Sequence, residues 1–148
     1  MKPLRNFWKL SPPDRIILLQ TYLLLTLIRL GLWLVPFERL WKLSLKLGQR
    51  PAKAVLSAKT DVQTVRQIVW AVNLSARFTP GGAKCLARAL TTKVLLDQRH
   101  CPSLFKIGVA KDASGGLDAH AWIEFQGHVV MGQVSKISEY TALPPLPI

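Results

Sequence analysis

The sequence is short of acidic residues: eight Asp and Glu stand against 20 Lys and Arg, for a formal net charge of +12 over 148 residues. Residues 1–60 hold eleven basic and two acidic residues, so +9 of that charge lies in the N-terminal part. Such a balance favours nucleic acid, an anionic membrane or an acidic partner. Zinc-finger spacing, an RNP-like run and basic heptads are all lacking, so we do not expect nucleic acid.

Cysteine and histidine are also scarce, with two and three copies. They do not have metal-ligand spacing, so no metal site is expected. If Cys85 begins a helix and Cys101 follows its end, the two lie roughly 20 Å apart, beyond the reach of a disulfide. Two free thiols suit a reducing cytoplasm. Gly115-Gly116 lacks the Lys-Ser/Thr of a phosphate-binding loop, so neither an ATP site nor another cofactor is expected.

Long apolar runs are limited to the N-terminal part. Thirteen residues separate Arg15 from Arg29, which is short of the roughly 20 needed to span a bilayer. No small-residue cleavage site follows, so a signal peptide is not indicated. We expect a cytoplasmic protein whose apolar, basic N-terminal helices contact a partner or a membrane surface.

Helix signals dominate the first two thirds of the chain. Ser11-Pro12-Pro13-Asp14 predicts a helix start, and the helix should run to about Leu30, where Gly31 and Pro36 interrupt it. The pattern next predicts an amphipathic helix over 37–47 and a linker over 48–59. A further helix should be capped by Thr60, with Gln63 three residues later as in a capping box. A Thr-Pro-Gly-Gly turn over 79–82 then leads into a helix over 83–98.

From Ser103 the period changes to that of strands, predicted over 104–109, 119–125 and 128–133, with Gln126-Gly127 as a two-residue hairpin turn and an irregular tail. Helices followed by an antiparallel sheet indicate the α+β class. We expect an N-terminal helical region over 1–59 and a core domain over 60–148.

Two residues suggest nucleophilic chemistry. Cys85 follows a glycine-rich turn in the first turn of a predicted helix, where unpaired N–H groups and the helix dipole favour the thiolate and could stabilise an oxyanion. His120 begins a predicted strand and could serve as general base and then acid. Trp122 shares its strand face, as a core residue or as a wall of the substrate site.

A third residue usually orients the histidine. Counting back from the Gln126-Gly127 turn places His120 opposite Gln133, whose amide oxygen could accept the imidazole proton. Asp118 and Glu124 are the acidic alternatives, although Glu124 lies about 6–7 Å along the strand. A backbone carbonyl or a water molecule would serve as well.

A cysteine at a helix start and a strand histidine 35 residues later resemble the core of the papain and transglutaminase superfamily. The motifs Cys85-Leu86-Ala87-Arg88-Ala89-Leu90 and Ala119-His120-Ala121-Trp122-Ile123-Glu124, with the helical stretch 23–41, are similar to those of the lasso-peptide biosynthesis B2 proteins. That family usually has an Asp on the next strand, where this chain has Met131-Gly132-Gln133.

The resemblance implies a papain- or transglutaminase-like core, with the nucleophile helix packed on a small antiparallel sheet. It implies a cysteine peptidase that removes the leader from a ribosomally made precursor, with Cys85 as nucleophile and His120 as base. The implied partners are the leader peptide, a separate leader-recognition protein of B1 type and an asparagine-synthetase-like cyclase. There are two alternatives. One is another acyl-transfer enzyme on the same core, and the other is a non-catalytic module that assembles a complex or contacts a membrane.

Overall fold

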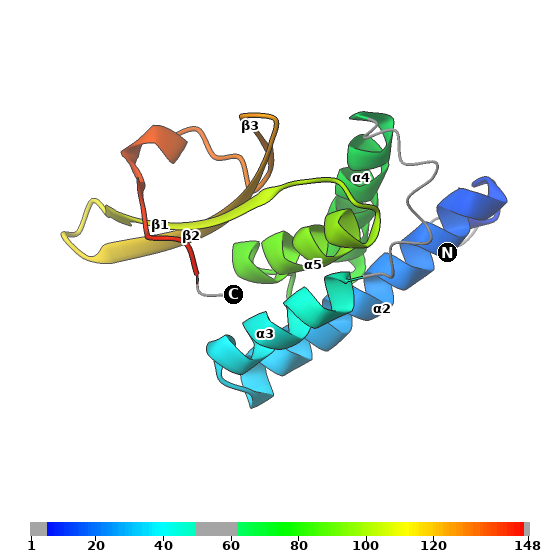
Figure 1. Cartoon of the computed structure of the whole chain (residues 1–148), viewed down its shortest axis with the longest axis horizontal. Coiled ribbons are helices and arrows are strands. Elements are labelled where there is room, and N and C mark those ends of the chain that lie inside the picture. Colours follow the sequence, from blue (N-terminus) through cyan, green and yellow to red (C-terminus); the bar gives the residue numbers. More distant parts are fainter. Residues whose placement is uncertain (1–5, 50–61, 147–148) are drawn as a thin grey trace.

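The computed structural model describes residues 6–49 and 62–146 of the chain. Helices come first along this part, and a sheet follows them (Figure 1). The helices are α2 (Pro12–Leu34), α3 (Phe37–Gly48), α4 (Val62–Phe78) and α5 (Cys85–Gln98), and the strands are β1 (Leu104–Lys111), β2 (Leu117–Phe125), β3 (His128–Met131) and β4 (Thr141–Ala142). The predicted α+β class and the order of helices before the sheet are confirmed.

The start of α2 is confirmed, with Ser11 as the N-cap residue and proline in the first turn. The hydroxyl of Ser11 donates to the Asp14 carboxylate at 2.5 Å instead of capping the helix. This hydrogen bond, followed by one that Gln67 of α4 donates, holds the pKa of Asp14 below its usual value. Asp14 therefore fixes the start of α2 against α4.

The predicted end of α2 at Leu30 was wrong, because the helix continues to Leu34. Val35 is extended because it precedes Pro36, so the proline rather than Gly31 ends the helix. A Cβ on Gly31 would come within 2.8 Å of a methyl carbon of Leu40. Gly31 therefore allows α3 to pack closely on α2.

Two predicted features fall outside the described residues: Thr60 as a helix cap, and most of the linker over 48–59. Gly48 belongs to the end of α3, where a Cβ would come within 2.7 Å of the Cβ of Asp97 on α5. Described from Val62 onward, α4 buries Val65, Ile68 and Val72 of its apolar stripe in the core, whereas Val62 at its start is exposed.

The sheet has the strand order β3-β2-β1-β4, with every pair antiparallel. Gln126 and Gly127 both have positive φ, as the predicted two-residue turn requires. The predicted pairs Phe125–His128 and Glu124–Val129 are confirmed. A β-bulge then shifts the register, so that Ile123 pairs with Met131 and β3 ends there. The predicted pairing of His120 with Gln133 is therefore not formed.

The C-terminal tail was predicted to be irregular, and this was wrong for two residues. Thr141 and Ala142 form β4 and pair with Val109 and Gly108 at the free edge of β1. The segment from Gly132 to Tyr140 therefore connects one edge of the sheet with the other. In Figure 1 it is the orange and red stretch that passes over the strands.

The core lies between the helices and one face of the sheet. Ala121, Ile123 and Phe125 alternate along β2, are buried, and pack with residues of α4 and α5. Alternation places His120 and Trp122 on the other face of the strand. There His120 contacts Tyr140 of the connecting segment.

Candidate active site

Cys85 is the first residue of α5 and is partly exposed. The turn before it depends on Gly81 and Gly82, which have φ values of +74° and +71°, a region that side chains disfavour. Arg29 of α2 donates a hydrogen bond to the carbonyl of Pro80 and so ties this turn to the N-terminal helix. The Cys85 thiol therefore lies at the N-terminus of α5, directly after a turn that the Arg29 hydrogen bond ties to α2.

The N-terminus of α5 has no side-chain cap, since the N-cap residue is Lys84 and its side chain makes no capping hydrogen bond. The first intrahelical hydrogen bond runs from Arg88 N–H to the Lys84 carbonyl. The N–H groups of the residues between them have no partner within the helix. Directed at the position of an oxyanion, such groups stabilise a tetrahedral intermediate.

The imidazole of His120 is held by the backbone. Its Nε2 lies 2.5 Å from the Gly132 carbonyl oxygen. A carbonyl can only accept a hydrogen bond, so Nε2 carries the proton and Nδ1 is the nitrogen with the lone pair. Gly132 has φ +82°, and a Cβ there would come within 2.6 Å of the Ala121 carbonyl oxygen. Only glycine fits this position without strain, and it supplies the acceptor that the sequence assigned to Gln133.

Trp122 supports the histidine from beneath. The two rings are nearly parallel, with an interplanar angle of 17° and centroids 6.2 Å apart. The indole is 4 % exposed, and its N–H donates to Glu124 at 2.9 Å. Because Trp122 is buried, we assign its ring a packing role beside the imidazole. A contact of Trp122 with substrate stays a prediction.

The acidic alternatives have partners of their own. Glu124 accepts from Trp122 and pairs with Lys106 at 2.9 Å, and these two contacts, the indole first, lower the pKa of its carboxyl group. Asp118 accepts the hydroxyl proton of Tyr140 at 2.5 Å. Gln133 is exposed, beyond the end of β3. Among the described residues, the hydrogen-bond partner of the His120 ring is the carbonyl oxygen of Gly132.

Tyr140 is the residue that the sequence did not reveal. Its ring lies 5.4 Å from that of His120, and its hydroxyl donates to Asp118. The hydrogen bond to Asp118 is the largest cause of its raised pKa. Tyr140 therefore contacts the imidazole of His120 while its hydroxyl is held by Asp118. One tyrosine in an irregular segment has no periodicity that could have placed it.

The described residues show no hydrogen bond between the Cys85 thiol and the His120 ring. Catalytic hydrogen bonds of this kind often tighten only when substrate binds. In the described part of the chain, no three His, Cys, Asp or Glu side chains are grouped to hold a metal ion.

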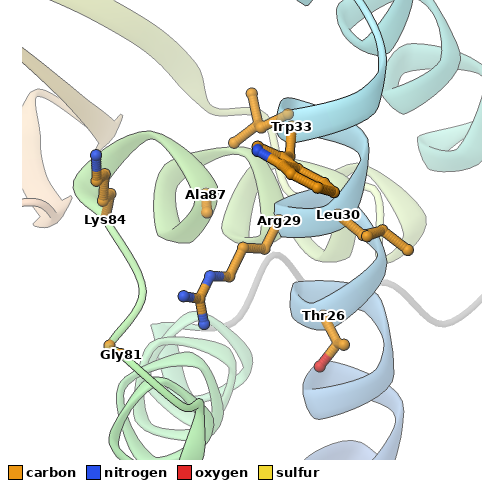
Figure 2. A pocket seen from close by; sticks show the side chains of 9 residues that line it. Thr26, Arg29, Leu30, Trp33, Gly81, Lys84 and Ala87 are labelled. Atoms are coloured by element: carbon orange, nitrogen blue, oxygen red, sulfur yellow. The ribbon is translucent and has the colours of Figure 1, made fainter.

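A pocket of about 560 Å³ opens between α2 and the start of α5. Arg29, Leu30 and Trp33 line it on one side, and Gly81, Lys84 and Ala87 on the other. Figure 2 shows the Arg29 side chain extending toward Gly81 below the Trp33 ring, while Lys84 points away from it. Cys85 and His120 are not among the residues that line this pocket, so it is separate from their surroundings.

Gly108→Ala should disturb the histidine through Trp122. A Cβ at this position would come within 2.7 Å of the indole and 3.1 Å of the Thr141 carbonyl oxygen. We expect a loss of about 1–3 kcal/mol in the free energy of unfolding, and a fall in kcat because the support of His120 shifts. Denaturant unfolding and turnover measure the two effects.

Tyr140→Phe keeps the ring against His120 but removes the hydrogen bond to Asp118. We expect little change in stability, because this hydrogen bond is exposed, and a reduction in kcat of less than about tenfold. Tyr140→Ala, which also removes the ring, should lower kcat further. Equal kcat values for the two variants would show that the ring does not position the imidazole.

Comparison with known protein families agrees with this geometry. The family model described as Transglutaminase-like superfamily matches residues 31–144, from the last turns of α2 to beyond β4. No curated protein and no solved structure gives a significant match. The matched region covers most of the chain, including Cys85, His120 and Tyr140. The chain therefore belongs to the transglutaminase-like superfamily.

Proposed function

We propose that this protein is a cysteine peptidase that removes the leader from a ribosomally synthesised lasso-peptide precursor. The superfamily includes cysteine hydrolases and acyltransferases, and the motifs around Cys85 and His120 resemble those of the lasso-peptide B2 proteins. Two features together support catalysis best: Cys85 lies at an uncapped helix N-terminus, and the hydrogen bond to Gly132 fixes the tautomer of His120.

In such a cleavage we assign each group the following role. The Cys85 sulfur attacks the carbonyl carbon at the leader–core junction, and Nδ1 of His120 takes the thiol proton. The N–H groups at the start of α5 hold the oxyanion. The imidazolium returns its proton to the departing amine of the core, and water then hydrolyses the thioester to release the leader as a free acid.

The partners follow from the same proposal. A separate leader-recognition protein would deliver the precursor, and an asparagine-synthetase-like cyclase would use the liberated amine. The pocket between α2 and the start of α5 would take a part of the precursor away from the scissile bond, with Arg29 and Trp33 as its polar and aromatic walls. The cyclase and the recognition protein are also the first proteins to test for binding to the N-terminal helices.

The test is to mix the purified protein with the precursor peptide encoded beside its gene, with and without the recognition protein, and to measure product masses. We expect two fragments whose masses sum to that of the precursor plus one water. A product that retains an added amine would instead show acyl transfer to another acceptor. An unchanged precursor, with no thioester on Cys85 after acid quench, would contradict catalysis and favour an assembly role.

A further inference from the structure

The outer face of α2 is apolar along almost its whole length. Its large side chains there are 49 to 82 % exposed: Ile16, Leu19, Leu23, Leu27, Leu30 and Trp33. They recur at three- and four-residue steps, so they form one stripe about 25 Å long, which we call the α2 stripe. A helix on a protein surface normally turns polar residues outward. The α2 stripe is therefore a surface that something covers.

The opposite face of α2 belongs to the protein core. Leu25 and Ile28 are buried, and α2 packs against α4 and α5. By length and composition alone, α2 could cross a membrane, with a mean hydropathy of 1.8 over its most apolar window. A helix with one side in a protein core cannot be surrounded by lipid, so it would lie on a bilayer rather than span it.

The helix beside α2 carries exposed basic residues. On α3, Arg39, Lys42 and Lys46 follow one another at one-turn steps, and Lys42 pairs with Glu38 at 3.1 Å. Two exposed leucines, Leu43 and Leu47, lie among them. Figure 1 shows α2 and α3 side by side along one border of the molecule, away from the sheet. An apolar helix beside a basic one suits the surface of an anionic bilayer, where acyl chains lie beneath negatively charged headgroups.

Two further features favour lipid over a protein partner. Trp8 and Trp33 are 68 and 82 % exposed near the two ends of α2, and tryptophan concentrates where a bilayer meets water. Thr26, on the exposed side of α2, satisfies its hydroxyl on the Tyr22 carbonyl of the same helix. Few polar groups are left to pair across a protein interface, where about one hydrogen bond per 100–200 Å² is usual.

We propose that α2 and α3 dock this protein on an anionic membrane surface, with the α2 stripe in the acyl boundary and the α3 lysines and arginine at the headgroups. Leu30 and Trp33 also line the pocket between α2 and the start of α5. Docking would therefore hold the mouth of that pocket at the edge of the bilayer. This inference does not depend on the proposed peptidase activity.

Sedimentation of the full chain with lipid vesicles tests the proposal. We expect binding to vesicles of phosphatidylcholine with about 30 % phosphatidylglycerol, weaker binding to phosphatidylcholine alone, and a loss of the difference at high salt. Leu23→Glu with Leu27→Glu should lower the partition coefficient at least about tenfold. Lys42→Glu with Lys46→Glu should weaken binding to the anionic vesicles alone.

The matched control changes two leucines that are equally exposed but lie in the sheet. Leu104→Glu with Leu117→Glu should bind as the unchanged protein does, and circular dichroism should show that all variants are folded. Unchanged binding by the α2 double variant would overturn the proposal. So would a failure of the unchanged protein to bind either vesicle. A dimer in light scattering that the α2 double variant converts to monomer, without vesicle binding, would assign the α2 stripe to a second copy instead.

Discussion

Cys85→Ala should abolish cleavage, with a loss of at least about 10⁴-fold in kcat, because the variant lacks the attacking sulfur. Alanine suits the first turn of a helix, and Cys85 is only partly buried, so the melting temperature should change by no more than about 2 °C. Cleavage is followed by product mass and stability by thermal unfolding. A variant that retains cleavage would exclude Cys85 as the nucleophile.

Reactivity of the thiol provides a second measurement that needs no substrate. Iodoacetamide should label Cys85 faster than Cys101, but burial of Cys101 alone could cause this, since it is 2 % exposed. The decisive comparison is therefore the labelling rate of Cys85 at pH 6–7 with and without His120. We expect His120→Ala to slow it, because the imidazole favours the thiolate. An unchanged rate would show that the two residues do not act together.

His120→Ala should lower kcat by roughly 10³-fold, since it removes both the general base and the acid that protonates the leaving amine. Gln133→Ala is the matched control on the neighbouring segment. It should cost far less, because Gln133 is exposed and the Gly132 carbonyl already holds Nε2 of the ring. Kinetics of the two variants on one peptide decide the matter.

An equal loss in Gln133→Ala and His120→Ala would contradict this assignment. It would mean that the amide of Gln133 orients the imidazole during turnover, as the hairpin register first suggested. A large rise in KM with unchanged kcat for His120→Ala would contradict a role in proton transfer. It would assign His120 to substrate binding instead.

Features that depend on local signals could be predicted from the sequence. Ser11 as N-cap and the Gln126-Gly127 turn follow from residue preferences that act over a few residues, whereas α5, predicted from residue 83, begins at Cys85. The first two pairs of the hairpin follow from the turn itself. The α+β class needed only the change in period near Ser103.

Features that depend on distant contacts could not. The bulge beside Ile123 moves Gly132, rather than Gln133, next to His120, and no local pattern marks it. The short strand β4 exists because β1 has a free edge, and Tyr140 reaches the histidine only because that pairing brings the tail back. The end of α2 was misjudged because Gly31 serves close packing against Leu40 rather than chain termination.

The missing side-chain cap at Lys84 implies a trade-off between stability and activity. Lys84→Asp would supply an acceptor for the N–H groups of α5 and should stabilise the protein by about 1 kcal/mol. The same carboxylate would occupy the donors that face a developing oxyanion and would oppose a thiolate at Cys85, so the more stable enzyme should be the slower one. Selection for turnover would then keep the N-terminus of α5 less stable than it would be with a capping residue at position 84.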